Sequence, residues 1–91
     1  MLATTIGQMF RAARVSRGIS MYKVERNTGV PHCYIDRLEK GQYNPKRVTF
    51  FSISQLAKYY GLKLDVVYKT LMKEISDFEL TDEKENIKWT L

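Results

Sequence analysis

Apolar side chains recur at three- and four-residue spacing along most of this chain, which is the period of an amphipathic helix. The spacing predicts five helices joined by short loops, over residues 6–16, 21–28, 31–40, 50–60 and 64–75. Thr5, Ser20 and Thr49 stand just before three of them, where a hydroxyl accepts a free backbone N–H. A glycine ends each of the first four helices. Loop 42–48, after the third helix, is polar and basic.

The predicted helices each present an apolar stripe that indicates one shared core. The stripes comprise Ile6, Met9, Phe10, Ala13, Val24, Thr28, Ile35, Leu38, Ile53, Leu56, Ala57, Tyr60, Leu64, Val67, Tyr68, Leu71 and Ile75. Five short helices with short connections are typical of a compact all-α domain. We therefore expect one such domain over residues 1–75.

The pattern changes in the last sixteen residues, where apolar and polar positions alternate. Phe78 and Leu80 alternate with charged residues, and a polar stretch over 81–86 separates them from Ile87, Trp89 and Leu91. A period of two predicts short strands, and the polar stretch predicts a turn. We expect residues 76–91 to form a C-terminal extension, either a β-hairpin or an extended arm.

Charge and cysteine usage narrow the class of protein. Residues 1–75 hold 13 Lys and Arg against 5 Asp and Glu, a net +8, whereas residues 76–91 hold 2 against 5, a net −3. A basic body indicates a polyanionic partner, although charge can also serve solubility alone. Cys33 is the only cysteine, so the chain forms no internal disulfide. No apolar run approaches the ~18 residues of a membrane span, and the N-terminus lacks signal-peptide order, so we expect a cytoplasmic protein without a membrane partner.

Residues 20–40 have the order helix, tight glycine turn, helix. A helix-turn-helix needs a small residue in that turn because its two helices cross closely there. The second helix then stands clear of the body and can enter the major groove of DNA.

Matching residues in this order make the chain resemble the Cro/CI-type helix-turn-helix proteins, also called the xenobiotic-response-element family. They are Arg14, Gly18, Ile19, Ser20, Gly29, Val30, Ile35, Leu38-Glu39-Lys40-Gly41, Leu56-Ala57, Gly61-Leu62, Leu64 and Val67. The resemblance covers residues 6–71. It implies a five-helix lambda-repressor-like domain that binds double-stranded DNA in a sequence-specific way.

The resemblance also assigns roles to residues. It implies base contacts for His32, Cys33, Tyr34 and Arg37, and a buried ion pair between Arg14 and Glu39. Residues flanking the third helix are candidates for phosphate contacts, namely Ser20, Met21, Lys23, Asn44, Lys46 and Arg47. The alternative is that the exposed ones are ordinary solvated surface.

The chain departs from the family pattern at three places. Glu25 stands where a small residue is usual, so its charge must reach solvent or pair with Arg26 or with a residue of the recognition helix. Met21 stands where relatives carry a glutamine that contacts DNA, which puts that contact in doubt. The loop over 41–49 is longer than usual by a few residues.

These features favour a transcriptional repressor of a phage, plasmid or mobile element that binds a two-fold operator as a homodimer. The dimer would use the fifth helix and the apolar residues of the extension, Phe78, Leu80, Ile87, Trp89 and Leu91. The alternative for the extension is a frayed tail. The alternative function is an antitoxin-type module that binds a protein partner through residues 76–91. We expect no enzyme, cofactor or metal site, because the sequence shows no catalytic constellation and His32 is the only histidine.

Overall fold

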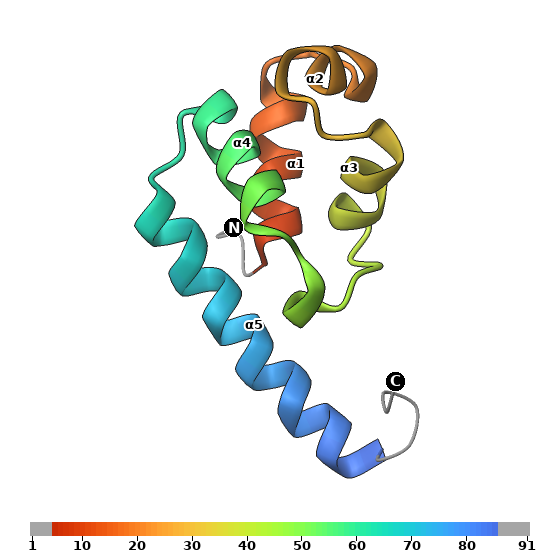
Figure 1. The fold of residues 1–91 in the computed structure, drawn as a ribbon, viewed down its shortest axis with the longest axis vertical. Helices are drawn as coiled ribbons and strands as arrows, with labels where there is room; N and C mark the ends of the chain where they lie inside the picture. Colours follow the sequence, from red (N-terminus) through yellow and green to blue (C-terminus); the bar gives the residue numbers. More distant parts are fainter. Residues whose placement is uncertain (1–4, 86–91) are drawn as a thin grey trace.

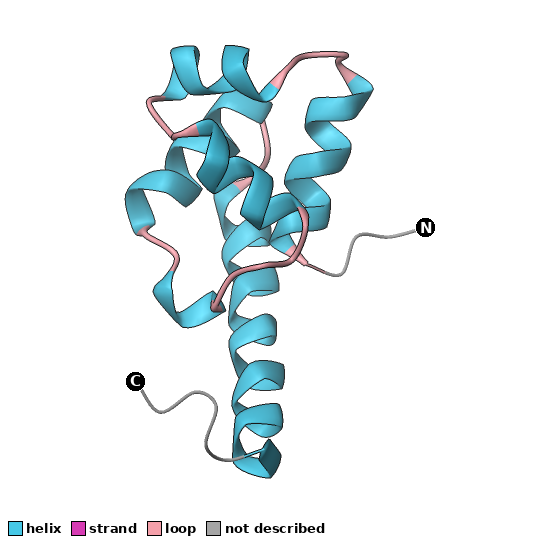
Figure 2. Ribbon diagram, turned by 90° about the vertical axis from the view of Figure 1, so that its right-hand side faces the viewer, coloured by secondary structure: helices cyan, strands magenta, loops and turns pink. Residues whose placement is uncertain are grey.

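The structure is a computed structural model that describes residues 5–85. This part of the chain is helical and contains no strand, as Figure 2 shows. The elements are α1 (Ile6–Ser16), α2 (Met21–Thr28), α3 (His32–Glu39), the 3-10 helix η1 (Pro45–Arg47), α4 (Phe50–Tyr60) and α5 (Leu64–Glu85). The prediction of a small all-α domain is confirmed.

Local capping explains where most helices begin and end. The side-chain oxygens of Thr5, Ser20 and Thr49 each accept a backbone N–H three residues later, at 3.1 Å. Gly29 and Gly61 end α2 and α4 in the left-handed conformation, with φ of 82° and 71°. Pro31 lies one position before α3 as its N-cap, rather than inside it as predicted.

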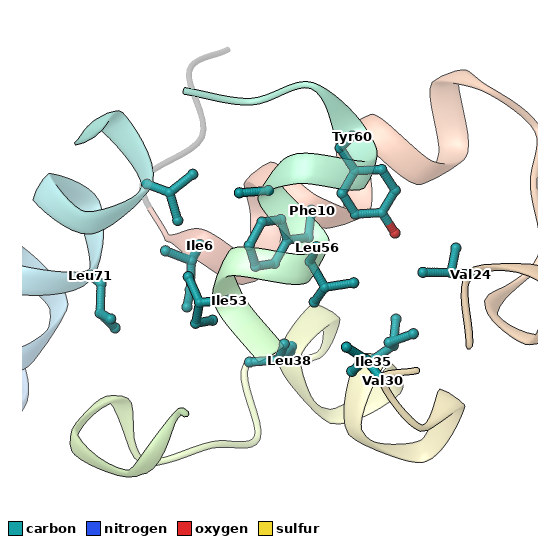
Figure 3. Close-up of a cluster of buried hydrophobic side chains, with 12 residues drawn as sticks. Ile6, Phe10, Val24, Val30, Ile35, Leu38, Ile53, Leu56, Tyr60 and Leu71 are labelled. Atoms are coloured by element: carbon teal, nitrogen blue, oxygen red, sulfur yellow. The ribbon is translucent and has the colours of Figure 1, made fainter. Parts of the chain in front are cut away.

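In the part of the chain that the structure describes, the core lies between the five α-helices (Figure 3). Of the side chains described, twelve hydrophobic ones in this core are buried: Ile6, Phe10, Val24, Val30, Ile35, Leu38, Ile53, Leu56, Ala57, Tyr60, Val67 and Leu71. The prediction of Leu64 as a core residue is wrong, since its side chain is 39% exposed. Leu62, just before α5, packs against this end of the core instead.

Residues 76–85 continue α5, so the predicted strand containing Phe78 and Leu80 is wrong. The chain has no glycine or proline after Gly61 that would stop the helix. Phe78 is half-buried and follows the core residue Leu71 by two helical turns. The expected boundary between Ile75 and Ser76 falls inside this unbroken helix. Ile87, Trp89 and Leu91 lie outside the described residues.

The arrangement of the helices leaves α3 and α5 on opposite sides of the domain (Figure 1). Between them lie α1 and α4, and the C-terminal half of α5 projects beyond the other helices. Gly7 allows α1 to approach the end of α3, because a Cβ atom there would lie 2.0 Å from the carbonyl oxygen of Leu38. Among the described residues, no helix is long and apolar enough to cross a membrane.

Candidate nucleic-acid interface

The turn between α2 and α3 is held by one buried side chain. The hydroxyl of Thr28 donates to the carbonyl of Val24 at 2.7 Å and accepts the backbone N–H of Val30 at 3.1 Å. Val30 is fully buried. Gly29, between Thr28 and Val30, adopts the left-handed conformation with a positive φ, which glycine tolerates best. The angle between α2 and α3 is therefore fixed by packing and hydrogen bonds.

Arg14 and Glu39 form an ion pair that joins α1 to the end of α3. The guanidinium donates from Nε and Nη2 to the two carboxylate oxygens at 2.7 and 2.8 Å. Its Nη1 donates to the carbonyl of Ile19 at 3.0 Å. The side chain of Glu39 is 2% exposed, and its hydrogen bond raises the pKa of Arg14. The pair anchors α3 from the side opposite to its open face.

The open face of α3 carries Cys33 and Arg37, and the C-cap residue Lys40 continues it; all three are exposed and follow one another at helical spacing. Tyr34 is half-buried, and its hydroxyl accepts the backbone N–H of Thr49 at 3.4 Å. Of the four candidates for base contacts, Cys33 and Arg37 therefore lie on the open face, whereas Tyr34 leans toward the start of α4.

His32, the first residue of α3, contacts two residues of α2. Its Nδ1 lies 2.6 Å from Oε1 of Glu25, and its backbone N–H donates to the same oxygen at 3.0 Å. The ring of Tyr22 lies against the imidazole, with 4.4 Å between centroids. The hydrogen bond from the His32 side chain lowers the pKa of Glu25. The partner of Glu25 is thus a residue of the recognition helix, one of the two alternatives that the sequence left open.

Loop 42–48 brings candidate phosphate-binding residues beside α3. Arg37, Asn44 and Arg47 line one open pocket of about 250 Å³, whose other walls include Tyr34 and Leu38. Asn44 also caps η1, since its Oδ1 accepts the backbone N–H of Lys46 at 2.9 Å. The loop is therefore folded, with the buried Pro45 at its centre.

The other phosphate candidates differ in their surroundings. Lys23 is exposed near the start of α2, where the Ser20 hydroxyl is already engaged as the N-cap. Met21 is half-buried and packs against the core. Lys46 pairs with Glu79 of α5 at 3.0 Å, so its ammonium group lies between the loop and α5.

Glu74 of α5 also contacts loop 42–48, and the sequence analysis missed it. Its Oε2 accepts the backbone N–H of Ile6 at 2.7 Å, and its Oε1 accepts the hydroxyl of Tyr43. Burial raises the pKa of Glu74. The pKa of Tyr43 is also raised, mainly by burial and to a lesser extent by its hydrogen bond to Glu74. The sequence did signal an unusual residue here, because Glu74 stands among the apolar positions of the predicted fifth helix. It did not indicate that Ile6 and Tyr43 would be its partners.

One comparison with known proteins agrees with this geometry. A family model described as a helix-turn-helix domain matches residues 9–67, which span the chain from α1 to the first turn of α5. No curated protein and no solved structure shows a significant match to the chain. The match covers more than half of the sequence and includes the fixed α2–turn–α3 unit. The chain therefore belongs to the helix-turn-helix domain family of DNA-binding proteins.

Proposed function

We propose that this protein is a sequence-specific regulator of transcription of the Cro/CI type. It acts as a repressor of a phage, plasmid or mobile element and inserts α3 into the major groove. The carrying observation is the exposed stripe of Cys33, Arg37 and Lys40 on a helix whose opposite side is buried and locked by Arg14 and Glu39. A rigid helix whose open face carries Arg37, together with Lys40 paired to Asp36, suits a groove about 12 Å wide.

In the proposed complex, base edges and phosphates are contacted by different groups. Arg37 donates two hydrogen bonds to guanine, and Cys33 contacts a neighbouring base. His32 reads a base at the N-terminal end of the helix, while Tyr34 reaches the edge of the site. Residues before and after α3 in the sequence approach the phosphate backbone of the DNA, where positive charge and N–H donors fix the register of the protein on the duplex. They are Ser20, Met21, Lys23, Asn44, Lys46 and Arg47.

The proposed assembly is a two-fold dimer that presents two copies of α3 to half-sites one helical turn apart. Its surface lies on α5, where Leu64, Val66 and Met72 are exposed, together with the extension beyond residue 75. Exposed apolar groups on the side away from α3 suit a second copy because they leave the recognition helices free.

Selection of bound sequences from a random duplex pool tests the DNA-binding proposal. We expect a recovered site with two-fold symmetry and an affinity that falls steeply with salt. Recovery of no preferred sequence would contradict the proposed function.

Sedimentation tests the dimer separately. Met72→Glu places a charge on α5 at a side chain that is 61% exposed, so it should yield folded monomers. Val15→Glu makes the same change at an exposed position of α1 and should remain dimeric. A dimer that survives Met72→Glu with unchanged affinity would exclude this surface.

A further inference from the structure

The contact between Glu25 and His32 determines where the imidazole carries its proton. An ionised carboxylate has only acceptor sites, so a nitrogen 2.6 Å from it must be a donor. The same carboxylate oxygen already accepts the backbone N–H of His32, which favours its ionised form further. The Nδ1 atom of His32 therefore carries a hydrogen, and in the neutral ring Nε2 is then a bare acceptor.

The geometry also directs that acceptor away from α2. Nδ1 and Nε2 lie on different edges of the ring, so Nε2 faces away from Glu25. The Tyr22 ring lies against the imidazole at a tilt of 36° and restricts its rotation, while the His32 side chain remains 43% exposed. His32 is also the first residue of α3, and the N-terminal residues of a recognition helix are those that contact base edges.

We infer that Glu25 selects the His32 tautomer with the proton on Nδ1, and that Nε2 then accepts a hydrogen bond from the exocyclic amino group of adenine or cytosine. In the major groove, only adenine N6 and cytosine N4 offer such donors, whereas guanine and thymine present acceptors. Guanine or thymine at that position would place two lone pairs against each other. Glu25 is a positioning residue in this scheme, and the inference rests on the proposed function.

The tautomer is measurable without DNA. Long-range nitrogen–proton NMR spectra of the whole protein, at about pH 8.5 where imidazoles are ordinarily neutral, should show a protonated Nδ1 and an unprotonated Nε2 on His32. Glu25→Gln should shift this signal toward a mixture, because a side-chain amide can donate to Nδ1 as well as accept from it. A ring protonated on Nε2 in the unmodified protein would overturn the inference.

Base preference is the second measurement, made on the site recovered from the random duplex pool at the same pH. At one position the protein should favour adenine or cytosine over guanine and thymine by about fivefold, the usual effect of one hydrogen bond. Both His32→Ala and Glu25→Gln should reduce this discrimination to less than about twofold. A merely structural role of Glu25 would weaken binding to all sequences without changing the preference.

Asp36→Asn is the matched control, because it also removes one carboxylate charge from the helix-turn-helix. Asp36 is 37% exposed and pairs with Lys40, and it should leave the preference at the His32 position unchanged. Preference that persists in both His32→Ala and Glu25→Gln overturns the inference while the proposed function stands. A pool that yields no preferred site overturns the proposed function and the base readout together, and the NMR result then decides the tautomer alone.

Discussion

Replacing Gly7 with alanine should force α1 away from α3. The new Cβ atom would lie 2.0 Å from the carbonyl oxygen of Leu38 and 3.0 Å from its carbonyl carbon. Ordinary contacts begin at 3.4 Å, so the shortfall from 2.0 Å is about 1.4 Å. The obstacle is backbone rather than a flexible side chain, and one of the two helices must therefore move.

The size of the effect follows from the packing that this movement disrupts. Phe10 and Leu38 are fully or almost fully buried, and gaps of 0.5–1 Å already lose about a quarter to a half of the local dispersion energy. Overpacking of this kind costs about 3 kcal/mol at the upper end of the usual range. Alanine recovers about 1 kcal/mol through its helix propensity. We expect a net loss of about 2 kcal/mol and a melting temperature lower by about 8–16 °C.

Thermal and urea unfolding, followed by circular dichroism, measure this loss. Gly41→Ala is the control, because no atom of the described residues lies within 4 Å of its added Cβ and its φ of 75° is what opposes the substitution. That strain should cost about 1 kcal/mol. If Gly7→Ala unfolds no more readily than Gly41→Ala, the close approach of α1 and α3 is wrong.

Three further predictions concern the Arg14–Glu39 ion pair, the DNA contacts and the half-buried carboxylate of Glu74. Glu39→Ala strands the charge of Arg14 and should destabilise the fold by about 3–5 kcal/mol, while the folded fraction keeps its operator preference; an unchanged melting temperature would contradict the anchoring role. In binding titrations, Arg47→Ala should weaken all sequences alike and reduce the salt slope by about one, whereas Arg37→Ala should relax preference at one base position, and an unchanged preference would show that the recognition face is misassigned. The raised pKa of Glu74 means that its ionised form opposes folding, so its contribution to stability should be greatest below its unfolded pKa and decline as pH rises through its folded pKa. In urea unfolding between about pH 4 and 7, Glu74→Gln should remove this dependence while keeping a hydrogen bond to each partner, because the amide oxygen can accept the Ile6 N–H and the amide nitrogen can donate to the Tyr43 hydroxyl; parallel profiles for the two proteins would refute the assignment.

Local signals explain why most helix limits could be predicted from the sequence. The hydroxyls of Thr5, Ser20 and Thr49 and the left-handed glycines act within one turn, so their effect is visible without knowledge of the fold. The apolar stripes of the first four helices could also be predicted, because their spacing can be recognised within each segment of the sequence. The prediction for Leu64 was wrong because the burial of a residue at the end of a helix depends on its neighbours in the fold, and here Leu62 packs against the core instead.

The extension shows the limit of a pattern over a few residues. Phe78 and Leu80 fit a period of two, but Leu71, Ile75 and Phe78 also fit one face of a helix. What distinguishes the two patterns is tertiary contact, since Glu79 meets Lys46 and Phe78 is half-buried. The Glu79–Lys46 contact joins residues more than thirty positions apart, and spacing alone cannot reveal it.

The candidate site was predictable in outline, but its hydrogen bonds were not. The motif located α3 and its open face, including Arg37, and the unusual Glu25 signalled an additional interaction. Whether that charge would meet Arg26 or the recognition helix depended on the angle between α2 and α3. In the structure the partner of Glu25 is His32, whose Nδ1 lies 2.6 Å from the carboxylate. A residue of α2 thus orients the imidazole at the start of α3.

Loop 42–48 shows how a distant helix shapes the DNA-facing side. Taken alone, this stretch is a polar and basic loop, a few residues longer than the family pattern, and nothing in its sequence indicates what holds it. In the fold, Glu74 accepts a hydrogen bond from Tyr43 just before the short 3-10 segment, and Glu79 pairs with Lys46 inside it, so two carboxylates of α5 hold the loop. Because Arg47 belongs to that segment and lines the same pocket as Arg37, the position of one basic side chain beside α3 depends on contacts made by α5. The open face of the recognition helix is therefore organised from both sides of the domain, by the Arg14–Glu39 pair on one side and by α5 on the other.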